Sequence, residues 1–167
     1  IAVVTAREAH GLSAADVPDA VVYLTDQAHH CVHKALRIAG MEESRLREVP
    51  TDGDRRMDPE ALAERIRDDR GAGRIPWMVV SSAGTTDVGA VDPLDEISDV
   101  AREEQVWHHV DAAYGGFFLL CPDMAPKFGG IERSDSVVMD PHKGLFLPYG
   151  LGAVVIKDRE AMHRAHR

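Results

Sequence analysis

Short apolar runs alternate with segments of helical periodicity, and this alternation constrains the fold more than any other feature of the chain. We expect six strands, of which the second is short and less apolar; they lie at 21–24, 46–49, 77–80, 106–110, 136–139 and 152–156. Continuous apolar strands are buried on both faces, and strands that alternate with helices usually run parallel. The sequence therefore predicts an α/β domain with a mostly parallel sheet flanked by helices.

The segments between the strands carry signals for helix starts. A helix is expected from about 28 to 39. Asp58 and Pro59 predict the start of the next helix, because Asp caps helix N-termini and Pro suits the first helical position. Asp92 and Pro93 repeat this pair, so we expect another helix to open in the same way.

Composition limits the class of protein. The chain has 167 residues, 44% hydrophobic and 28% charged, as expected for one globular domain. Its formal net charge of −9 argues against a nucleic-acid partner, because such binding depends on clustered Lys and Arg. No apolar tract approaches the roughly 18 residues of a membrane span, so no membrane partner is expected. Cys31 and Cys121 suggest no disulfide framework, which favours a cytoplasmic location.

Both ends of the chain have the pattern of element interiors. Residues 1–8 contain no initiator Met, and residues 161–167 continue a helical pattern. We therefore expect 1–167 to be part of a single, longer domain.

Polar residues follow four of the predicted strands directly. In open α/β sheets, ligands bind beyond the carboxyl ends of the strands, so these segments are expected to meet at one edge. They supply an amine, a carboxylate, an imidazole and hydroxyl groups. The segments are Asp26–His29, Ser81–Thr86, Asp111–Tyr114 and Asp140–Lys143.

Lys143 and Asp111 form the most informative pair in this set. Pyridoxal phosphate (PLP) needs a lysine for its Schiff base and a carboxylate opposite its pyridinium nitrogen. Lys143 lies between Pro141 and the apolar residues 145–147, where an unpaired ammonium would be costly to bury. Taken alone, Lys143 reads as a surface residue and Asp111 as a turn cap, but those readings require several coincidences at one edge.

The histidines leave a metal site as an alternative. His29 and His33 have the i, i+4 spacing of helical zinc ligands, and His109 lies two residues before Asp111. This alternative lacks a compact ligand motif and leaves Lys143 without a role. We therefore predict no metal.

Four segments together resemble one known family. Asp26–His29, Gly84–Thr86, His109–Tyr114 and Pro141–Lys143 are similar, in order and spacing, to segments of the group II PLP-dependent amino-acid decarboxylases. The resemblance runs from about 21 to 157 and implies the large domain of a fold-type I PLP enzyme. It also implies that a phosphate-binding loop precedes this chain, that a small domain follows it, and that the parent protein is a homodimer.

The resemblance implies a role for each matching residue. Lys143 would form the Schiff base, and Asp111 would pair with the pyridine nitrogen and keep it protonated. His29 would stack on one face of the ring and Ala113 would pack against the other. Thr86 would bind near the cofactor's substituents or the substrate carboxylate.

Two further residues are implied to lie near the cofactor, and two positions differ from what the family usually has. Asp140 and His142 would lie near the cofactor phosphate. Asp140 stands where several members have asparagine, and Gly144 stands where many have a bulky aromatic residue. These departures make it unsafe to transfer substrate specificity from a relative.

The resemblance implies decarboxylation of an L-amino acid to an amine by a carboxy-lyase. Another fold-type I enzyme, such as an aminotransferase, a sulfur lyase or an aldehyde-forming relative, is an alternative, because it would share Lys143 and Asp111. A non-catalytic PLP-binding fragment and a metal-dependent hydrolase are the others. We expect the isolated 167-residue segment to have little or no turnover.

Overall fold

One six-stranded sheet runs through the molecule, and the computed structural model describes all residues from 1 to 167. The strand order is β2-β1-β3-β4-β5-β6. Strands β1 to β5 run parallel to their neighbours, and only β6 is antiparallel, against β5. The strands are β1 Ala20–Leu24, β2 Arg45–Glu48, β3 Ile75–Ser82, β4 Trp107–Asp111, β5 Ser136–Met139 and β6 Ala153–Ile156. The predicted mostly parallel α/β architecture is confirmed.

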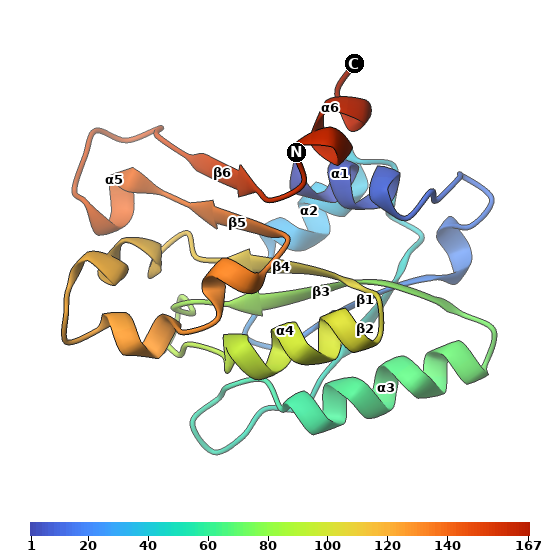
Figure 1. Ribbon diagram of the computed structural model, residues 1–167, viewed down its shortest axis with the longest axis horizontal. Coiled ribbons are helices and arrows are strands. Elements are labelled where there is room, and N and C mark those ends of the chain that lie inside the picture. Colours follow the sequence, from blue (N-terminus) through green and yellow to red (C-terminus); the bar gives the residue numbers. More distant parts are fainter.

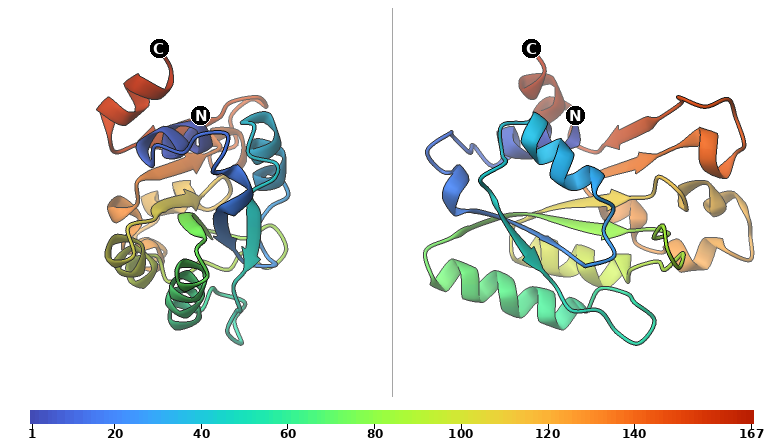
Figure 2. Two further views of the ribbon diagram at one scale, coloured as in Figure 1. Left: turned by 90° about the vertical axis from the view of Figure 1, so that its right-hand side faces the viewer. Right: turned by 180° about the vertical axis from the view of Figure 1, so that it is seen from behind.

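Helices cover both faces of this sheet (Figures 1 and 2). Helices α1 (Ala2–Ala9) and α2 (Cys31–Ile38) lie on one face, and α3 (Pro59–Gly71) and α4 (Leu94–Glu103) lie on the other. The short α5 (Pro141–Gly144) follows β5. The carboxyl ends of β3 and β4 point towards the side on which α5 lies (Figure 1).

The two ends of the chain lie side by side (Figures 1 and 2). Helix α6 (Arg159–Ala165) packs against α1, and Thr5 Oγ1 is 3.2 Å from His166 Nε2.

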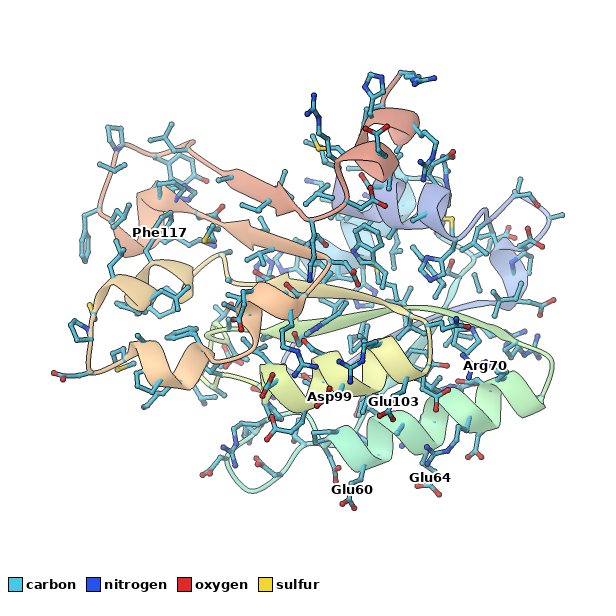
Figure 3. All side chains as sticks on the ribbon, viewed as in Figure 1. Glu60, Glu64, Arg70, Asp99, Glu103 and Phe117 are labelled. Atoms are coloured by element: carbon cyan, nitrogen blue, oxygen red, sulfur yellow. The ribbon has the colours of Figure 1, made fainter.

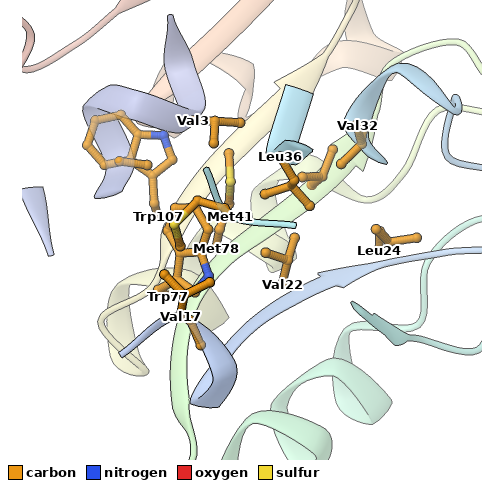
Figure 4. Close-up of a cluster of buried hydrophobic side chains, with 13 residues drawn as sticks. Val3, Val17, Val22, Leu24, Val32, Leu36, Met41, Trp77, Met78 and Trp107 are labelled. Carbon is orange, nitrogen blue, oxygen red and sulfur yellow. The ribbon is translucent and has the colours of Figure 1, made fainter. Parts of the chain in front are cut away.

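A buried cluster joins α1 and α2 to the sheet (Figure 4). Val32 and Leu36, four residues apart on α2, pack with Val22, Met78 and Trp107 from three strands. Side chains one residue further along a strand point to the opposite face. The sheet is therefore apolar on both faces, as its continuous apolar runs predict.

The second cluster lies between the sheet and α3 and α4. Leu62 and Ile66 are fully buried on α3, and Ile97 lies on the facing side of α4. They contact Val21 and Val79, whose chain neighbours face the first cluster. The outward sides of the same helices carry charge, as Glu60 and Glu64 show in Figure 3. None of the helices combines the length and the apolar character that crossing a membrane requires.

The two expected Asp-Pro helix starts differ in the structure. Asp58 caps α3 as predicted, because its Oδ1 accepts hydrogen bonds from the N–H groups of Glu60 at 2.9 Å and Ala61 at 3.1 Å. The prediction for Asp92 is wrong. Helix α4 starts at Leu94 after Pro93, without a side-chain cap. The Asp92 carboxylate is used for a long-range contact instead.

The helix expected from 28 starts three residues later, at Cys31. Residues 25–28 form a turn in which Ala28 N–H donates to the Thr25 carbonyl at 3.1 Å. His29 and His30 therefore precede the helix. This leaves the segment after β1 as a loop at the carboxyl edge of the sheet.

Candidate functional site

A cavity of about 190 Å³ opens beyond the carboxyl ends of β1, β3, β4 and β5. Each of the four segments predicted to meet at this edge contributes to its wall. Of the seven predicted site residues, the wall includes six: His29, Thr86, Asp111, Ala113, Asp140 and Lys143.

Lys143 reaches the cavity from the short helix α5. Its Nζ forms an ion pair with Asp140 Oδ2 at 3.0 Å, and the two side chains are 41% and 20% exposed. The amine is therefore held by a carboxylate at the cavity wall, but it is not sealed from solvent.

Asp111 is the last residue of β4 and lies between two neighbouring strands. Its register partners are Ser82 on β3 and Val138 on β5, so the backbone beneath the carboxylate is held from both sides. Oδ1 accepts a hydrogen bond from Ala113 N–H at 3.1 Å. Oδ2 has no hydrogen-bond partner within the chain, so this oxygen is free to bind a cationic N–H group of a ligand.

The His29 ring has one nitrogen engaged by the backbone. Cys31 N–H donates to His29 Nδ1 at 3.2 Å, so in the neutral ring the proton sits on Nε2. The ring centroid is 4.1 Å from that of His30, with the planes inclined by 42°. His29 therefore lines the cavity with one ring nitrogen, Nε2, that makes no hydrogen bond within the chain.

A buried carboxylate anchors the loop that carries Thr86. Asp92 accepts hydrogen bonds from Ser82 N–H at 2.6 Å and Met57 N–H at 2.7 Å, and its own N–H donates to the Ser82 carbonyl at 2.9 Å. Burial raises the pKa of Asp92, while the two N–H donors act in the opposite direction. Thr85 Oγ1 accepts from Ala90 N–H at 3.0 Å and closes the same loop.

The backbones of two cavity loops are in close contact. A methyl group on Gly115 would overlap the Ala83 carbonyl oxygen. Gly84 has a φ of +100°, and a Cβ there would lie 3.1 Å from the Gly115 backbone. Both glycines therefore allow the β3 and β4 loops to approach each other beside Asp111.

A hydrogen-bonded chain lies behind Asp111. The Trp107 indole N–H donates to Ser136 Oγ at 2.8 Å, and Ser136 Oγ is 2.8 Å from His109 Nδ1. Indole is only a donor, so the Ser136 hydroxyl proton is available for His109 Nδ1. Burial lowers the pKa of His109 to about 4, although the charge of Asp111 opposes this shift. The imidazole beside Asp111 is therefore neutral at pH 7.

His142 is the one predicted residue outside the cavity wall. Its Nδ1–H donates to the Leu151 carbonyl at 2.5 Å, and its ring packs edge-on against Tyr149 at 4.9 Å between centroids. The residue next to Lys143 thus holds the loop after α5 in place. A role near the cofactor phosphate stays a prediction.

The imidazoles of the metal alternative are not brought together. His29, His33 and His109 line three different cavities. No group of three or more His, Cys, Asp or Glu side chains is arranged to hold a metal ion. That alternative therefore has no ligand set in this structure.

A model of the pyridoxal-dependent decarboxylase conserved domain matches residues 4–167. This chain belongs to the pyridoxal-dependent decarboxylase family. The resemblance that the four sequence segments indicate is thereby confirmed, as is the class of cofactor for the family.

The chain is similar to parts of several longer proteins. The aromatic-L-amino-acid decarboxylase of Bacillus atrophaeus is 39% identical over 152 residues, which cover 91% of this chain and 32% of the relative. The crystal structure of Rhodiola rosea 4-hydroxyphenylacetaldehyde synthase matches with a TM-score of 0.91 and 30% identity, covering 98% of this chain and 36% of that one. Oryza sativa TDC with PLP and tryptamine matches with a TM-score of 0.90 and 36% identity, covering 97% and 34%. The chain thus spans about a third of the length of these proteins.

Some residues in the wall of this cavity were not singled out by the sequence. Ser82 and Tyr114 lie within the predicted segments, so the strand-end rule found their position but not their role. Cys31 had no such signal, because it follows the predicted segment and lies at the first position of α2. Asp92 lay in a helix-start pattern, and only its long-range hydrogen bonds show that it supports the site.

Proposed function

We propose that the complete protein decarboxylates an L-amino acid to an amine and carbon dioxide with the help of PLP. The observation that carries this proposal is the convergence of Lys143, Asp111, His29 and Ala113 on one cavity, in a chain of the pyridoxal-dependent decarboxylase family. The cavity offers an amine for the cofactor's aldehyde and a carboxylate oxygen without a partner for its ring nitrogen.

The residues present fit this cofactor. Lys143 is the amine to which the aldehyde would attach, and Asp140 holds its Nζ at the wall. Asp111 Oδ2 would accept a hydrogen bond from the protonated ring nitrogen and favour the charged form of the ring. When bound, the protonated ring supplies the electron sink for the pair released as the substrate's carboxylate leaves.

The other wall residues would orient the ring and the substrate. The His29 face would stack on the ring, while Ala113 is small enough to let the ring lie close to the end of β4. Neutral His109 leaves Asp111 without a competing cationic partner inside the protein. The Thr86 hydroxyl, on the anchored loop, would bind the substrate carboxylate or a cofactor substituent.

An aldehyde-forming reaction is the second candidate, because a solved structure similar to this chain is an aldehyde synthase. An aminotransferase or a sulfur lyase would also use Lys143 and Asp111. The products separate these reactions: an amine with carbon dioxide, an aldehyde, or a keto acid.

The experiment uses the complete protein. It is incubated with PLP, reduced with borohydride and digested, and the labelled peptide is identified by mass spectrometry. Parallel reactions with aromatic and acidic L-amino acids are analysed for all three product classes. We expect label on Lys143 and formation of amine with carbon dioxide. Label on another lysine, or an aldehyde or a keto acid as the main product, would contradict the proposal.

We further propose that the complete protein is a cytoplasmic homodimer. The loop after α5 exposes large apolar side chains, with Phe146 and Tyr149 each 93% exposed and Leu151 45% exposed. Large exposed apolar patches usually mark association sites. Light scattering should show a dimer, and Phe146→Asp combined with Tyr149→Asp should shift it towards monomer. A dimer unaffected by both substitutions would place the interface elsewhere.

A further inference from the structure

A second cavity, of about 390 Å³, lies between the outer side of α2 and the start of β2. Its volume is in the range of small-ligand sites. It shares no wall residue with the cavity around Lys143. The proposed decarboxylation therefore leaves this second cavity unexplained.

Basic side chains from α2 and from the residue before it form one wall of this cavity. His33, Lys34 and Arg37 of α2 line it, and so does His30, the N-cap residue; their i, i+3, i+4, i+7 spacing places them on one side. Neither Lys34 nor Arg37 takes part in an ion pair or a side-chain hydrogen bond within the chain. Seven of the fourteen other arginines form ion pairs, as Arg47 does with Asp69. The Lys34 and Arg37 donors are therefore free to bind an anion.

The opposite wall contains a buried hydroxyl without a partner. Ser44 is 7% exposed and its Oγ has no hydrogen-bond partner. Buried polar groups are nearly always hydrogen-bonded, so an unpartnered hydroxyl in a cavity wall indicates a missing acceptor. Glu42, also in this wall, is its only acidic residue.

We propose that this cavity binds the phosphate group of a small soluble phosphate ester. Arg presents a planar fork of donors, Lys presents three donors, and Ser44 adds a hydroxyl. A phosphate has several acceptor oxygens and a charge of about −1.5 to −2 at pH 7, which matches a wall rich in donors better than a singly charged carboxylate does. The Glu42 carboxylate would repel the phosphate. Removing its charge should therefore strengthen phosphate binding.

Binding of inorganic phosphate is measured by calorimetry on the complete protein loaded with PLP, so that the cofactor site is filled. Lys34→Gln and Arg37→Gln should each weaken binding about tenfold, since each removes charge-assisted hydrogen bonds. Glu42→Gln should strengthen it about threefold, because an exposed repulsive charge is lost. Ser44→Ala should weaken binding about threefold without lowering the thermal midpoint, since its hydroxyl has no partner in the protein.

Lys127→Gln is the matched control, because Lys127 is an exposed lysine outside this cavity. It should leave phosphate binding unchanged. An equal loss in Lys127→Gln, or no loss in the Lys34→Gln/Arg37→Gln double variant, would overturn the proposal. Equally tight binding of acetate would overturn its selectivity for phosphate. Binding to phosphatidic-acid vesicles but not to inorganic phosphate would assign the cavity to a lipid headgroup. That result would overturn the proposal that the ligand is soluble.

Discussion

At the scale of single residues, the position of Asp111 determines what its carboxylate can do. One oxygen is held by Ala113 N–H, and the other is free at the cavity. The neighbouring imidazole of His109 is kept neutral by burial and accepts the hydroxyl of Ser136. The charge of Asp111 is therefore oriented by the backbone and left available to a ligand.

Asp111→Asn tests this role. An opposite charge shifts the pKa of its partner by about 1–3 units, so losing it should lower turnover of the complete protein about 10- to 1000-fold. Borohydride should still label Lys143, because the amine is unchanged. Steady-state kinetics and mass mapping measure the two effects.

Asp123→Asn, at an exposed position outside the cavity, is the control. Turnover equal to that of the unmodified protein would exclude the role proposed for Asp111.

At the scale of elements, Asp92 links the segment before α4 to two other elements. Its carboxylate accepts hydrogen bonds from Ser82 at the end of β3 and from Met57, the residue before the Asp58 cap of α3. Its contacts fix the start of the loop that carries Thr86 at the cavity. A carboxylate outside the cavity wall is therefore bonded to the backbone of a wall residue, Ser82.

Asp92→Asn should disrupt this link, because an amide offers one acceptor oxygen where two N–H donors need acceptors. Leaving a buried N–H unsatisfied costs about 1–3 kcal/mol, so the free energy of unfolding should fall by about that amount. PLP affinity should fall as well, although no wall residue is changed. Urea unfolding and cofactor titration measure both. Asp87→Asn, at an exposed position in the same loop, is the control and should change neither quantity. If Asp92→Asn lowered the free energy of unfolding but left PLP affinity unchanged, Asp92 would not support the site.

At the scale of the whole molecule, the layer between the sheet and α4 contains a buried histidine. The His108 ring nitrogens lie 2.7 Å from Ser81 Oγ and 3.0 Å from Ser98 Oγ. Burial lowers the pKa of His108 from 6.5 to about 3. Between pH 6.5 and 3 this histidine is therefore protonated in the unfolded chain but neutral in the folded chain. The free energy of unfolding falls as the pH falls through this range, because the unfolded state binds the extra proton.

His108→Gln removes that proton uptake while keeping groups that can hydrogen-bond both serines. Between pH 6 and 4.5, the stability of the unmodified protein should fall more steeply than that of the variant, by about 1.4 kcal/mol per pH unit. Urea unfolding at several pH values measures the difference. His163→Gln, at an exposed position on α6, should keep the steeper slope. Parallel slopes for the unmodified protein and His108→Gln would contradict the assignment.

Local patterns determined much of this protein. The strand pattern located all six strands to within about two residues. The signal is clearest for β1 and β3, because burial on both faces leaves a continuous apolar run. The Asp58 cap is also a local signal, because a capping carboxylate followed by Pro marks a helix start. The strand-end rule brought Lys143 and Asp111 to one edge, because parallel strands end on the same side of a sheet.

Only the tertiary structure decided which other groups join them. Asp58 and Asp92 have the same sequence context, yet one caps a helix and the other bonds to backbone groups from distant segments. His142 adjoins Lys143 in sequence but turns to Leu151. Cavity walls and buried hydrogen bonds are made by residues far apart in the chain. The local sequence specifies where a polar residue lies along its element, whereas packing determines which partner it meets.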